Sequence, residues 1–358
     1  MKLNGSDIIA EVLIEQGVDT IFGYPGGAVL NIYDALYKYR DKIHHILTAH
    51  EQGASHAADG YARATGKTGV VIATSGPGAT NLVTGIATAY MDSIPMVAIT
   101  GNVGTSYIGK DAFQEVYITG ITMPITKHNF FVSDIKELAP TLREAFKIAN
   151  SGRKGPVLVD IPKDVTAAIT EYEKAAPEVI IDNTVINEDE VKKAAALINK
   201  AKRPVIEIGG GVVSSEASDL VRMLVNKTGA PCCHTLMAAG VLGYSERLNY
   251  GLVGMHGSFV TNKAIDEADV LVAIGTRFSD RVALNTNRFA HKAKVIQIDI
   301  DLSEVDKNVK VDHALVGDVK TIVMDLLHYV KQSDRTDWLK TLDEYKNSDY
   351  HPVDSDKF

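Results

Sequence analysis

Cysteine is nearly absent from the sequence. Its 358 residues include two, Cys232 and Cys233, which are adjacent in an apolar run. Such a pair offers neither a disulfide framework nor a metal site of spaced ligands, so we expect two small core residues and no metal ligand set.

An excess of positive charge is also missing, because the sequence has 37 basic residues and 45 acidic ones, and the net charge is −8. Without a basic stripe, a nucleic-acid partner is not expected.

Long apolar runs are missing too. No run approaches the length of a membrane span, and the N-terminus enters a helical pattern without the charged segment and apolar core of a signal peptide. We therefore expect no membrane partner and a cytoplasmic protein.

What the sequence does contain is 45% apolar residues, in β-branched runs that alternate with longer amphipathic ones. This pattern is typical of a parallel sheet covered by helices on both faces, and it occurs twice. The predicted fold class is therefore α/β, with two doubly wound parallel-sheet domains. A first helix is expected over residues 6–16, with Ser6 as its N-cap and Gly17 as its stop. Strands are predicted at residues 20–23, 45–48, 69–74, 96–101, 156–161, 204–208, 230–234, 270–275 and 295–300.

Changes in composition suggest the domain limits. We predict a first domain over residues 1–166, a charged and proline-containing surface linker over 167–186, and a second domain over 187–332. Residues 333–358 are polar and include the only tryptophan, Trp338. This tail has no core of its own, so it either packs on the domains or leads into another one.

Glu51 is the first candidate catalytic residue. It begins a helix rich in alanine and glycine, and no Lys or Arg lies between Ala49 and Asp59. An acid at a helix N-terminus is ordinarily a favourable partner of the helix dipole. Burial among small residues would instead favour a carboxyl group that shares a proton.

Near matches to standard motifs are rejected. His50 and Glu51 lack the second histidine four residues after the first that a zinc-protease helix needs, and Gly66-Lys67-Thr68 precedes a strand instead of following one. The turn at residues 76–81 does follow a strand, but it ends in Asn81 where a dinucleotide fingerprint has glycine or alanine. Its glycines would let a ligand approach the backbone, and a plain structural turn is an equal alternative. The turn at residues 209–211 repeats the pattern in the second domain.

Taken together, five segments resemble thiamine-diphosphate enzymes, and the acetolactate (acetohydroxyacid) synthase large subunits most of all. They occur in order and with family-like spacing, at residues 22–28, 50–54, 60–63, 74–81 and 111–115, and the resemblance extends over essentially all 358 residues. The resemblance implies a first domain that binds the aminopyrimidine of thiamine diphosphate. It also implies a reaction in which pyruvate is decarboxylated and the two-carbon unit passes to pyruvate or 2-ketobutyrate, in valine, leucine and isoleucine biosynthesis.

The resemblance assigns roles residue by residue. Glu51 would hydrogen-bond a ring nitrogen of the cofactor, and Gln114 would act with it in catalysis. Further positions match the pyrimidine pocket, namely Tyr24, Thr74, Pro77 and Asn81. The substrate entrance would include Phe113, Gln114 and Lys163, for which a packed or solvated side chain is the plain alternative.

The second domain resembles the central domain that carries FAD in biosynthetic members of the family. An arginine and glycine turns suit a pyrophosphate, and an acid after a strand suits a ribose hydroxyl. The positions that match flavin contacts are Arg153, Gly209, Gly210, Gly211, Met255, His256, Gly257, Gly275, Thr276, Arg277, Phe278, Asp299, Ile300, Asp301, Gly317, Asp318 and Val319.

The sequence departs from this family in two ways. Gly104 stands where proline is common, and no segment matches the third domain that holds magnesium and the diphosphate. We therefore expect a truncated or split large subunit that is inactive alone, with a homodimer and a small regulatory subunit as partners. Alternatives are a pyruvate oxidase, a sulfoacetaldehyde acetyltransferase type of enzyme, or a non-catalytic flavin-binding protein.

Overall fold

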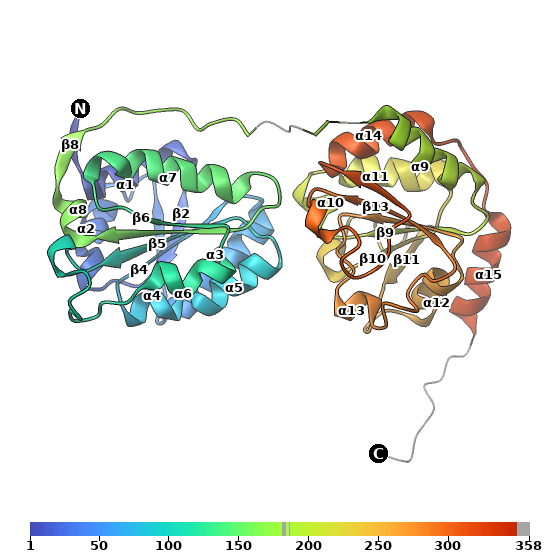
Figure 1. The fold of residues 1–358 in the computed structure, drawn as a ribbon, viewed down its shortest axis with the longest axis horizontal. Helices are drawn as coiled ribbons and strands as arrows, with labels where there is room; N and C mark the ends of the chain where they lie inside the picture. Colours follow the sequence, from blue (N-terminus) through green and yellow to red (C-terminus); the bar gives the residue numbers. More distant parts are fainter. Residues whose placement is uncertain (181–183, 186, 349–358) are drawn as a thin grey trace, which may run out of the picture. The chain divides into compact units, whose positions relative to one another are not determined.

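The computed structural model describes residues 1–180, 184–185 and 187–348. The chain forms two compact units, Met1–Ile181 and Asp182–Phe358, and each is a parallel sheet between two helical layers (Figure 1). This architecture confirms the predicted fold class.

The sheet of the first unit has six parallel strands in the order β3-β2-β4-β5-β7-β6. Their bounds are His44–Leu47 (β3), Thr20–Gly23 (β2), Gly69–Ala73 (β4), Met96–Asn102 (β5), Pro156–Pro162 (β7) and His128–Phe131 (β6). Every residue of the three central strands β4, β5 and β7 is buried, which explains their continuous apolar runs.

Helices cover both faces of this sheet. One face packs against α1 (Gly5–Glu15), α2 (Leu30–Lys38), α7 (Ile135–Asn150) and α8 (Lys163–Ala167). The other packs against α3 (Glu51–Thr65), α4 (Pro77–Asn81), α5 (Val83–Met91) and α6 (Ile118–Thr122). Short 3-10 turns complete the unit at Gly27–Val29 (η1), Thr105–Tyr107 (η2) and Met123–Ile125 (η3).

The N-terminus of α1 is capped differently from the prediction. The Asn4 side chain accepts the backbone N–H of Asp7 at 2.8 Å, and Ser6 lies inside the first turn and donates to Asn4 Oδ1. Gly17 follows the helix with φ +73, as its predicted role as a stop requires.

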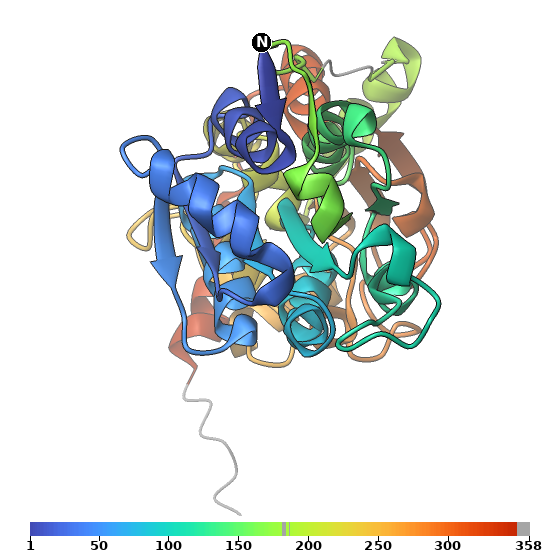
Figure 2. The same ribbon diagram turned by 90° about the vertical axis from the view of Figure 1, so that its left-hand side faces the viewer.

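Part of the predicted linker is built into the first unit. Residues Ile169–Glu171 form β8, which pairs antiparallel with β1 (Lys2–Asn4), and Figure 2 shows these two segments beside the N-terminus. Tyr172 is buried and its hydroxyl donates to Glu15, which also accepts the N–H of Ala175 at 2.9 Å. A buried acid with polar partners therefore anchors a segment whose charged composition suggests a linker. Residues 181–183 and 186 of the predicted linker lie outside the described residues.

The sheet of the second unit is also fully parallel, in the order β11-β10-β9-β12-β13-β14. Its strands are Asn249–Leu252 (β11), Cys232–His234 (β10), Pro204–Ile208 (β9), Val270–Ile274 (β12), Lys294–Asp299 (β13) and His313–Val316 (β14). One face carries α9 (Glu188–Lys200), α10 (Gly210–Ser214), α11 (Ser218–Thr228) and α14 (Val319–Tyr329). The other carries α12 (Phe259–Glu267), α13 (Asp280–Ala283) and α15 (Thr336–Asn347). Two 3-10 turns lie at Leu236–Ala238 (η4) and Leu302–Glu304 (η5).

The described part of the predicted tail, up to residue 348, packs on the second unit. Trp338 of α15 is buried, and its indole N–H donates to the carbonyl of Pro204 at 3.1 Å. Within the part of the chain that the structure describes, none of the helices has the length and apolar character needed to cross a membrane.

Candidate active site

The predicted site residues of the first unit meet at the carboxyl edge of its sheet. Chain order reverses between β2 and β4, because the chain passes from β2 outward to β3 and returns on the other side of β2. Ligands of open α/β sheets bind at such a switch point, outside the carboxyl ends of the strands. The residues that follow these strands are Tyr24 after β2, Glu51 after β3, Thr74, Pro77 and Asn81 after β4, Phe113 and Gln114 after β5, and Lys163 after β7.

Glu51 is the first residue of α3, and its side chain is buried. The preceding residue, His50, caps the helix through Nδ1, which accepts the N–H of Gln52 at 3.1 Å. Asn81 Nδ2 donates to Glu51 Oε2 at 2.9 Å. The Glu51 carboxylate is thus fixed by an amide from the end of α4, while its other oxygen faces the glycine turn.

The turn that leads into α4 requires glycine, because side chains at Gly76 and Gly78 would clash with their neighbours. Gly76 has φ +59, and a Cβ there would lie 2.7 Å from the carbonyl oxygen of Gln114. A Cβ on Gly78 would lie 2.7 Å from Thr74 Cγ2 and 3.3 Å from Glu51 Oε1. The backbone of this turn is therefore in close contact with Gln114 on one side and approaches Glu51 on the other.

Thr74 links this turn to the loop after β2. Its hydroxyl oxygen accepts the N–H of Ala28 at 3.1 Å, and a Cβ on Gly26 would lie 2.5 Å from the Thr74 side chain. Pro77 is exposed and stands at the start of α4. Thr74 is buried, so its place at the site is to hold two turns together.

The outer residues of the site are accessible. Tyr24 is 40% exposed and Phe113 88% exposed, and Lys163 is also exposed. Gln114 is half-buried, with a backbone φ of 59 that is unusual for a side chain other than glycine. All four follow strands at the carboxyl edge of the sheet, the edge at which the buried Glu51 side chain also lies.

Two residues near Glu51 were not predicted. The hydroxyl of Tyr33 lies 3.2 Å from His45 Nε2, and the two rings form an edge contact with centroids 5.0 Å apart. Burial, and secondarily the charge of Glu51, raise the pKa of Tyr33, and burial lowers the pKa of His45. The neutral phenol of Tyr33 and the neutral imidazole of His45 therefore lie on the Glu51 side of the site. The sequence carries no local sign of this pair, because it depends on how α2 packs against β3.

A buried acid near the same edge was also not predicted. Asp160 of β7 accepts hydrogen bonds from Thr100 Oγ1 at 2.7 Å and from Asn102 Nδ2 at 2.5 Å. Burial raises its pKa to about 6, against the effect of those two bonds. A signal was available, because Asp160 interrupts an apolar strand that is buried on both faces.

The second unit has its own switch point, between β9 and β12. The two turns that follow these strands are in direct contact there. A Cβ on Gly209 would lie 2.3 Å from the carbonyl oxygen of Gly275, and one on Gly211 would lie 2.6 Å from Gly275 Cα. Gly275 itself has φ +60. Only glycine at these positions lets the two turns pack against each other. At this point of the carboxyl edge the backbone therefore carries no side chains.

Unpaired polar atoms lie directly beneath these turns. Glu207 is fully buried and accepts a hydrogen bond from Thr276 Oγ1 at 3.0 Å, and Gln297 Nε2 donates to the Thr276 carbonyl at 3.2 Å. Among the described residues, neither Glu207 Oε2 nor Gln297 Oε1 has a hydrogen-bond partner. Burial raises the pKa of Glu207 to about 7. Like Asp160, this acid interrupts an apolar strand, which is the signal that could have found it.

The remaining predicted flavin-contact residues are spread around this unit, with one exception. Phe278 is buried in the core, where its ring packs on Phe289 with centroids 5.6 Å apart. Asp318 caps α14 by accepting the N–H groups of Lys320 and Thr321. Arg153 lies in the first unit, where its Nε donates to Ser93 Oγ at 2.9 Å.

The other members of that set lie at the carboxyl ends of five strands, β9, β11, β12, β13 and β14. Gly210 begins α10, and Arg277 and Thr276 follow β12. Met255, His256 and Gly257 follow β11, and the Met255 N–H donates to the Arg281 carbonyl at 2.8 Å. Asp299 ends β13 and accepts the N–H of Asp301, with Ile300 between them partly exposed. Gly317 precedes Asp318, and Val319 is buried as the first residue of α14.

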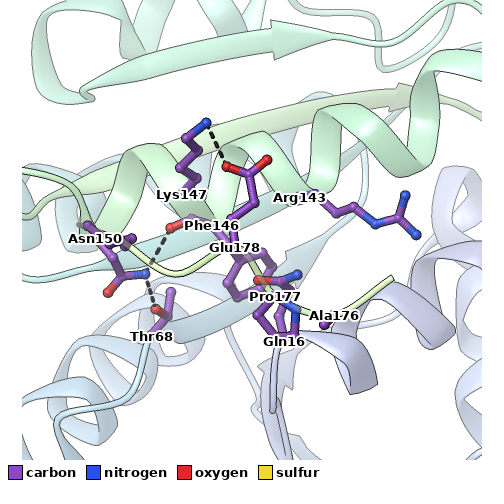
Figure 3. Close-up of a pocket in the computed structure, with 10 residues that line it drawn as sticks. Gln16, Thr68, Arg143, Phe146, Lys147, Asn150, Ala176, Pro177 and Glu178 are labelled. Atoms are coloured by element: carbon purple, nitrogen blue, oxygen red, sulfur yellow. Dashed lines mark hydrogen bonds and ion pairs between the residues drawn. The ribbon is translucent and has the colours of Figure 1, made fainter. Parts of the chain in front are cut away.

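A pocket on the first unit lies at the opposite edge of its sheet (Figure 3). Thr68, which precedes β4, and Asn150, which ends α7, line it and are joined by a hydrogen bond of 2.8 Å. Lys147 reaches Glu178 at 2.7 Å across the same pocket. Because this pocket lies at the amino ends of the strands and its charges are paired, it is not the candidate active site. No set of three or more His, Cys, Asp or Glu side chains able to hold a metal ion occurs in the described residues.

Comparison with known proteins gives matches to both units. Residues 3–121 match the family profile described as "Thiamine pyrophosphate enzyme, N-terminal TPP binding domain", and residues 191–326 match "Thiamine pyrophosphate enzyme, central domain". The chain is 48% identical over 363 residues to a "Probable acetolactate synthase large subunit" of Methanocaldococcus jannaschii, covering 99% of this chain and 61% of that protein.

Two further relatives agree with this one. The chain is 49% identical over 352 residues to an "Acetolactate synthase" of Mycobacterium leprae (96% of this chain, 56% of the relative). It is 46% identical over 350 residues to an "Acetolactate synthase large subunit" of Corynebacterium glutamicum (95% and 56%). The chain therefore spans less than two thirds of the length of these relatives. It belongs to the thiamine pyrophosphate enzyme family, of which it contains the N-terminal and central domains.

Proposed function

We propose that this chain is the N-terminal and central part of an acetolactate synthase large subunit. In this proposal the enzyme decarboxylates pyruvate and transfers the two-carbon unit to pyruvate or 2-ketobutyrate, in the biosynthesis of branched-chain amino acids. The observation that carries it is the buried Glu51 carboxylate at the switch point of a chain that is similar to acetolactate synthases over nearly its full length.

The first unit fits the aminopyrimidine of thiamine diphosphate. Glu51 offers a carboxylate that Asn81 holds in place, and its other oxygen faces the backbone of Gly78 in the glycine turn. When bound, this cofactor supplies an electron sink that accepts the charge left by decarboxylation of a 2-ketoacid. The carboxyl group of Glu51 would share a proton with a ring nitrogen of the cofactor in a hydrogen bond. Asn81 would keep that carboxyl group oriented.

Other residues of the site take supporting roles in this proposal. Tyr24, Thr74 and Pro77 would line the ring pocket, and Gln114 would contact the reacting 2-ketoacid from its position against the turn at Gly76. Phe113 and Lys163 are exposed at the same edge, where the lysine cation suits a substrate carboxylate and the aromatic ring suits the apolar part of a substrate.

The second unit fits FAD at its own switch point. Gly210, Gly211 and Gly275 are partly exposed and carry no side chain, which suits the close approach of a pyrophosphate. Asp299 ends β13 and Asp301 follows it at the same edge, where both would offer carboxylates to ribose hydroxyls. Flavin released from the purified protein by denaturation, detected by its absorbance and fluorescence, tests this assignment.

Magnesium, the cofactor's diphosphate and the assembly are further parts of the proposal. We assign the magnesium and diphosphate ligands to the part of the relatives' length that lies beyond this chain. A homodimer and a small regulatory subunit are the proposed partners, the latter because relatives are named large subunits.

A cytoplasmic location is supported by two free, buried cysteines, which suit a reducing compartment.

The test is acetolactate formation from pyruvate with thiamine diphosphate and magnesium. We expect no appreciable turnover by the 358-residue chain alone, and turnover when the C-terminal part of a relative is supplied as a second chain. Glu51→Gln should then lower the rate by about 10²- to 10⁴-fold, the usual contribution of a group that positions a proton.

The matched control is Glu137→Gln, which changes another glutamate in the first turn of a helix, on the exposed surface of α7. It should leave the rate unchanged. Robust turnover by the chain alone would contradict the proposed division of the active site. Formation of acetyl phosphate or hydrogen peroxide in place of acetolactate would contradict the proposed reaction.

A further inference from the structure

The loop over residues 103–117, between β5 and α6, carries Phe113 and Gln114. Two carboxylates from one short stretch of chain hold its first residues. Asp160 lies near the end of β7 and Asp164 lies in the first turn of α8. They are four residues apart, and Asp160 contacts Asn102, the last residue of β5, while Asp164 contacts Thr105 in the loop.

Asp160 acts on the loop through Asn102. The carboxylate is buried and accepts Asn102 Nδ2 at 2.5 Å, while Asn102 Oδ1 accepts the N–H of Val103 at 2.7 Å. Because the side-chain oxygen of Asn102 accepts the Val103 N–H, the other end of the Asn102 amide is the NH₂ group, which needs a hydrogen-bond acceptor. Asp160 provides that acceptor, and the first peptide of the loop is fixed in consequence.

Asp164 holds the loop two residues later. One of its oxygens accepts the N–H of Thr105 at 3.0 Å, and the other accepts the Thr105 hydroxyl at 2.5 Å. Thr105 begins the 3-10 turn η2, so this two-point contact sets the direction in which the loop leaves the sheet.

The far part of the loop is tied back on itself and onto the glycine turn. The carboxylate of Glu115 accepts the N–H groups of Gly109 and Ala112. Gln114 packs its backbone against Gly76, close enough that a Cβ on Gly76 would lie 2.9 Å from Gln114 Cα. The loop is therefore a braced segment, with Gln114 at one end and the two aspartates at the other.

We propose that Asp160 and Asp164 are positioning residues, which together fix the loop that presents Gln114 beside the glycine turn at Glu51. The significance of Gln114 rests on the proposed function, whereas the bracing of the loop rests on the contacts above. Neither aspartate needs to touch substrate or cofactor for this role.

Hydrogen exchange of the loop amides, measured by mass spectrometry on the full chain, tests the proposal. Asp164→Ala removes both contacts to Thr105, so peptides from residues 103–117 should exchange at least about 10-fold faster, as expected when a locally closed segment opens. Asp164→Asn should restore slow exchange, because its amide oxygen still accepts the Thr105 N–H and its NH₂ can donate to the Thr105 hydroxyl. Asp160→Ala should act in the same direction as Asp164→Ala.

Two controls separate bracing from general stability. Asp134→Ala removes a similar carboxylate contact, to the N–H of Lys136 at the start of α7, and should leave the loop unchanged. Thr105→Val removes the hydroxyl contact from the side of the loop, at an exposed position, and should speed exchange of the loop alone. Faster exchange throughout the unit, unchanged exchange of the loop, or an Asp164→Asn variant as fast as Asp164→Ala would overturn the proposal.

The role of Gln114 is tested separately. In the two-chain acetolactate assay, Gln114→Ala should lower the rate without changing loop exchange. An unchanged rate in that variant would reject the role of Gln114 in the proposed function and leave the exchange results as the test of the two aspartates.

Discussion

Gly76 shows how a single residue can determine the shape of the candidate site. Its φ is +59, and a Cβ added there would lie 2.7 Å from the Gln114 carbonyl oxygen, so the turn has no room for a side chain. We expect Gly76→Ala to lower the free energy of unfolding by about 2–4 kcal/mol, from a left-handed conformation and a backbone clash together. Urea denaturation measures this loss.

The matched control is Gly66→Ala at the end of α3. Gly66 has a similar φ of +74, but a Cβ there would have no atom within 4 Å. This variant should lose only about 1 kcal/mol, the usual cost of the left-handed conformation. Equal losses in the two variants would show that the contact with Gln114 does not constrain the turn.

Glu207 makes the stability of the second unit depend on pH. Burial raises its pKa from 4.5 to about 7. A group whose pKa is higher in the folded state holds its proton more tightly there, so its contribution is full below about pH 4.5 and is lost as the pH rises through about 7. Glutamine at this position has no such proton to lose.

Glu207→Gln should therefore gain stability relative to the wild type as the pH rises from 4.5 to 8. The expected gain is about 3 kcal/mol, from the size of the pKa shift. Chemical denaturation followed by the fluorescence of Trp338, the only tryptophan, reports on this unit. A difference between the two proteins that does not vary with pH would contradict a buried carboxyl group that keeps its proton.

Among the loops and helices, the start of the 103–117 loop offers a prediction about backbone stiffness. Gly104 stands where the family resemblance implies proline, and its φ of −58 and ψ of 147 suit proline well. An added Cβ would meet only ordinary contacts, the nearest at 3.7 Å from Asp164 Oδ1. We expect Gly104→Pro to raise the free energy of unfolding by about 0.4–1 kcal/mol, by restricting the unfolded chain.

Thermal or urea denaturation of the Gly104→Pro variant checks this value. Gly109→Pro is the contrasting variant, because Gly109 has φ +74 and its N–H donates to Glu115. That variant should be destabilised. Loss of stability in Gly104→Pro would mean that the loop does not keep the conformation described.

The sequence predicted the central strands of the two six-stranded sheets well, and of their four edge strands it predicted only β3. Strands β2 and β9 begin and end at the predicted residues, because buried parallel strands are continuous apolar runs bounded by turns. Strands β6, β11 and β14 were not predicted. Each lies at the edge of a sheet and contains partly exposed or polar residues, so its pairing depends on the neighbouring strand instead of on its own composition.

The candidate site was predictable where it depends on chain order. Glu51, Thr74 and Lys163 each follow a strand of one parallel sheet, and such residues necessarily share its carboxyl edge. The Tyr33 and His45 pair was not predictable in this way, because it joins a helix to an edge strand through side-chain packing. The roles of the site residues remain predictions.

At the scale of the molecule, each hydrophobic core of the described residues belongs to one unit. Among the described residues, two core clusters lie entirely within Met1–Ile181 and two within Asp182–Phe358. Each unit has the size of an ordinary independent domain. The predicted limit at residue 166 differs from the structural one because Tyr172 belongs to the first core and β8 pairs with β1, although the residues around them are charged.

Separate expression of the two units tests this division. Fragments 1–181 and 182–358 should each unfold cooperatively, as judged by circular dichroism and hydrogen exchange. A fragment that ends at residue 166 should be less stable than 1–181 by about 2–5 kcal/mol, because it loses β8 and leaves the buried Glu15 without Tyr172 and the N–H of Ala175. Glu15 would keep Arg143 as a partner, bound at 2.9 Å, so the shorter fragment should still fold. Equal stability of the 1–166 and 1–181 fragments would mean that residues 167–175 act as a linker after all.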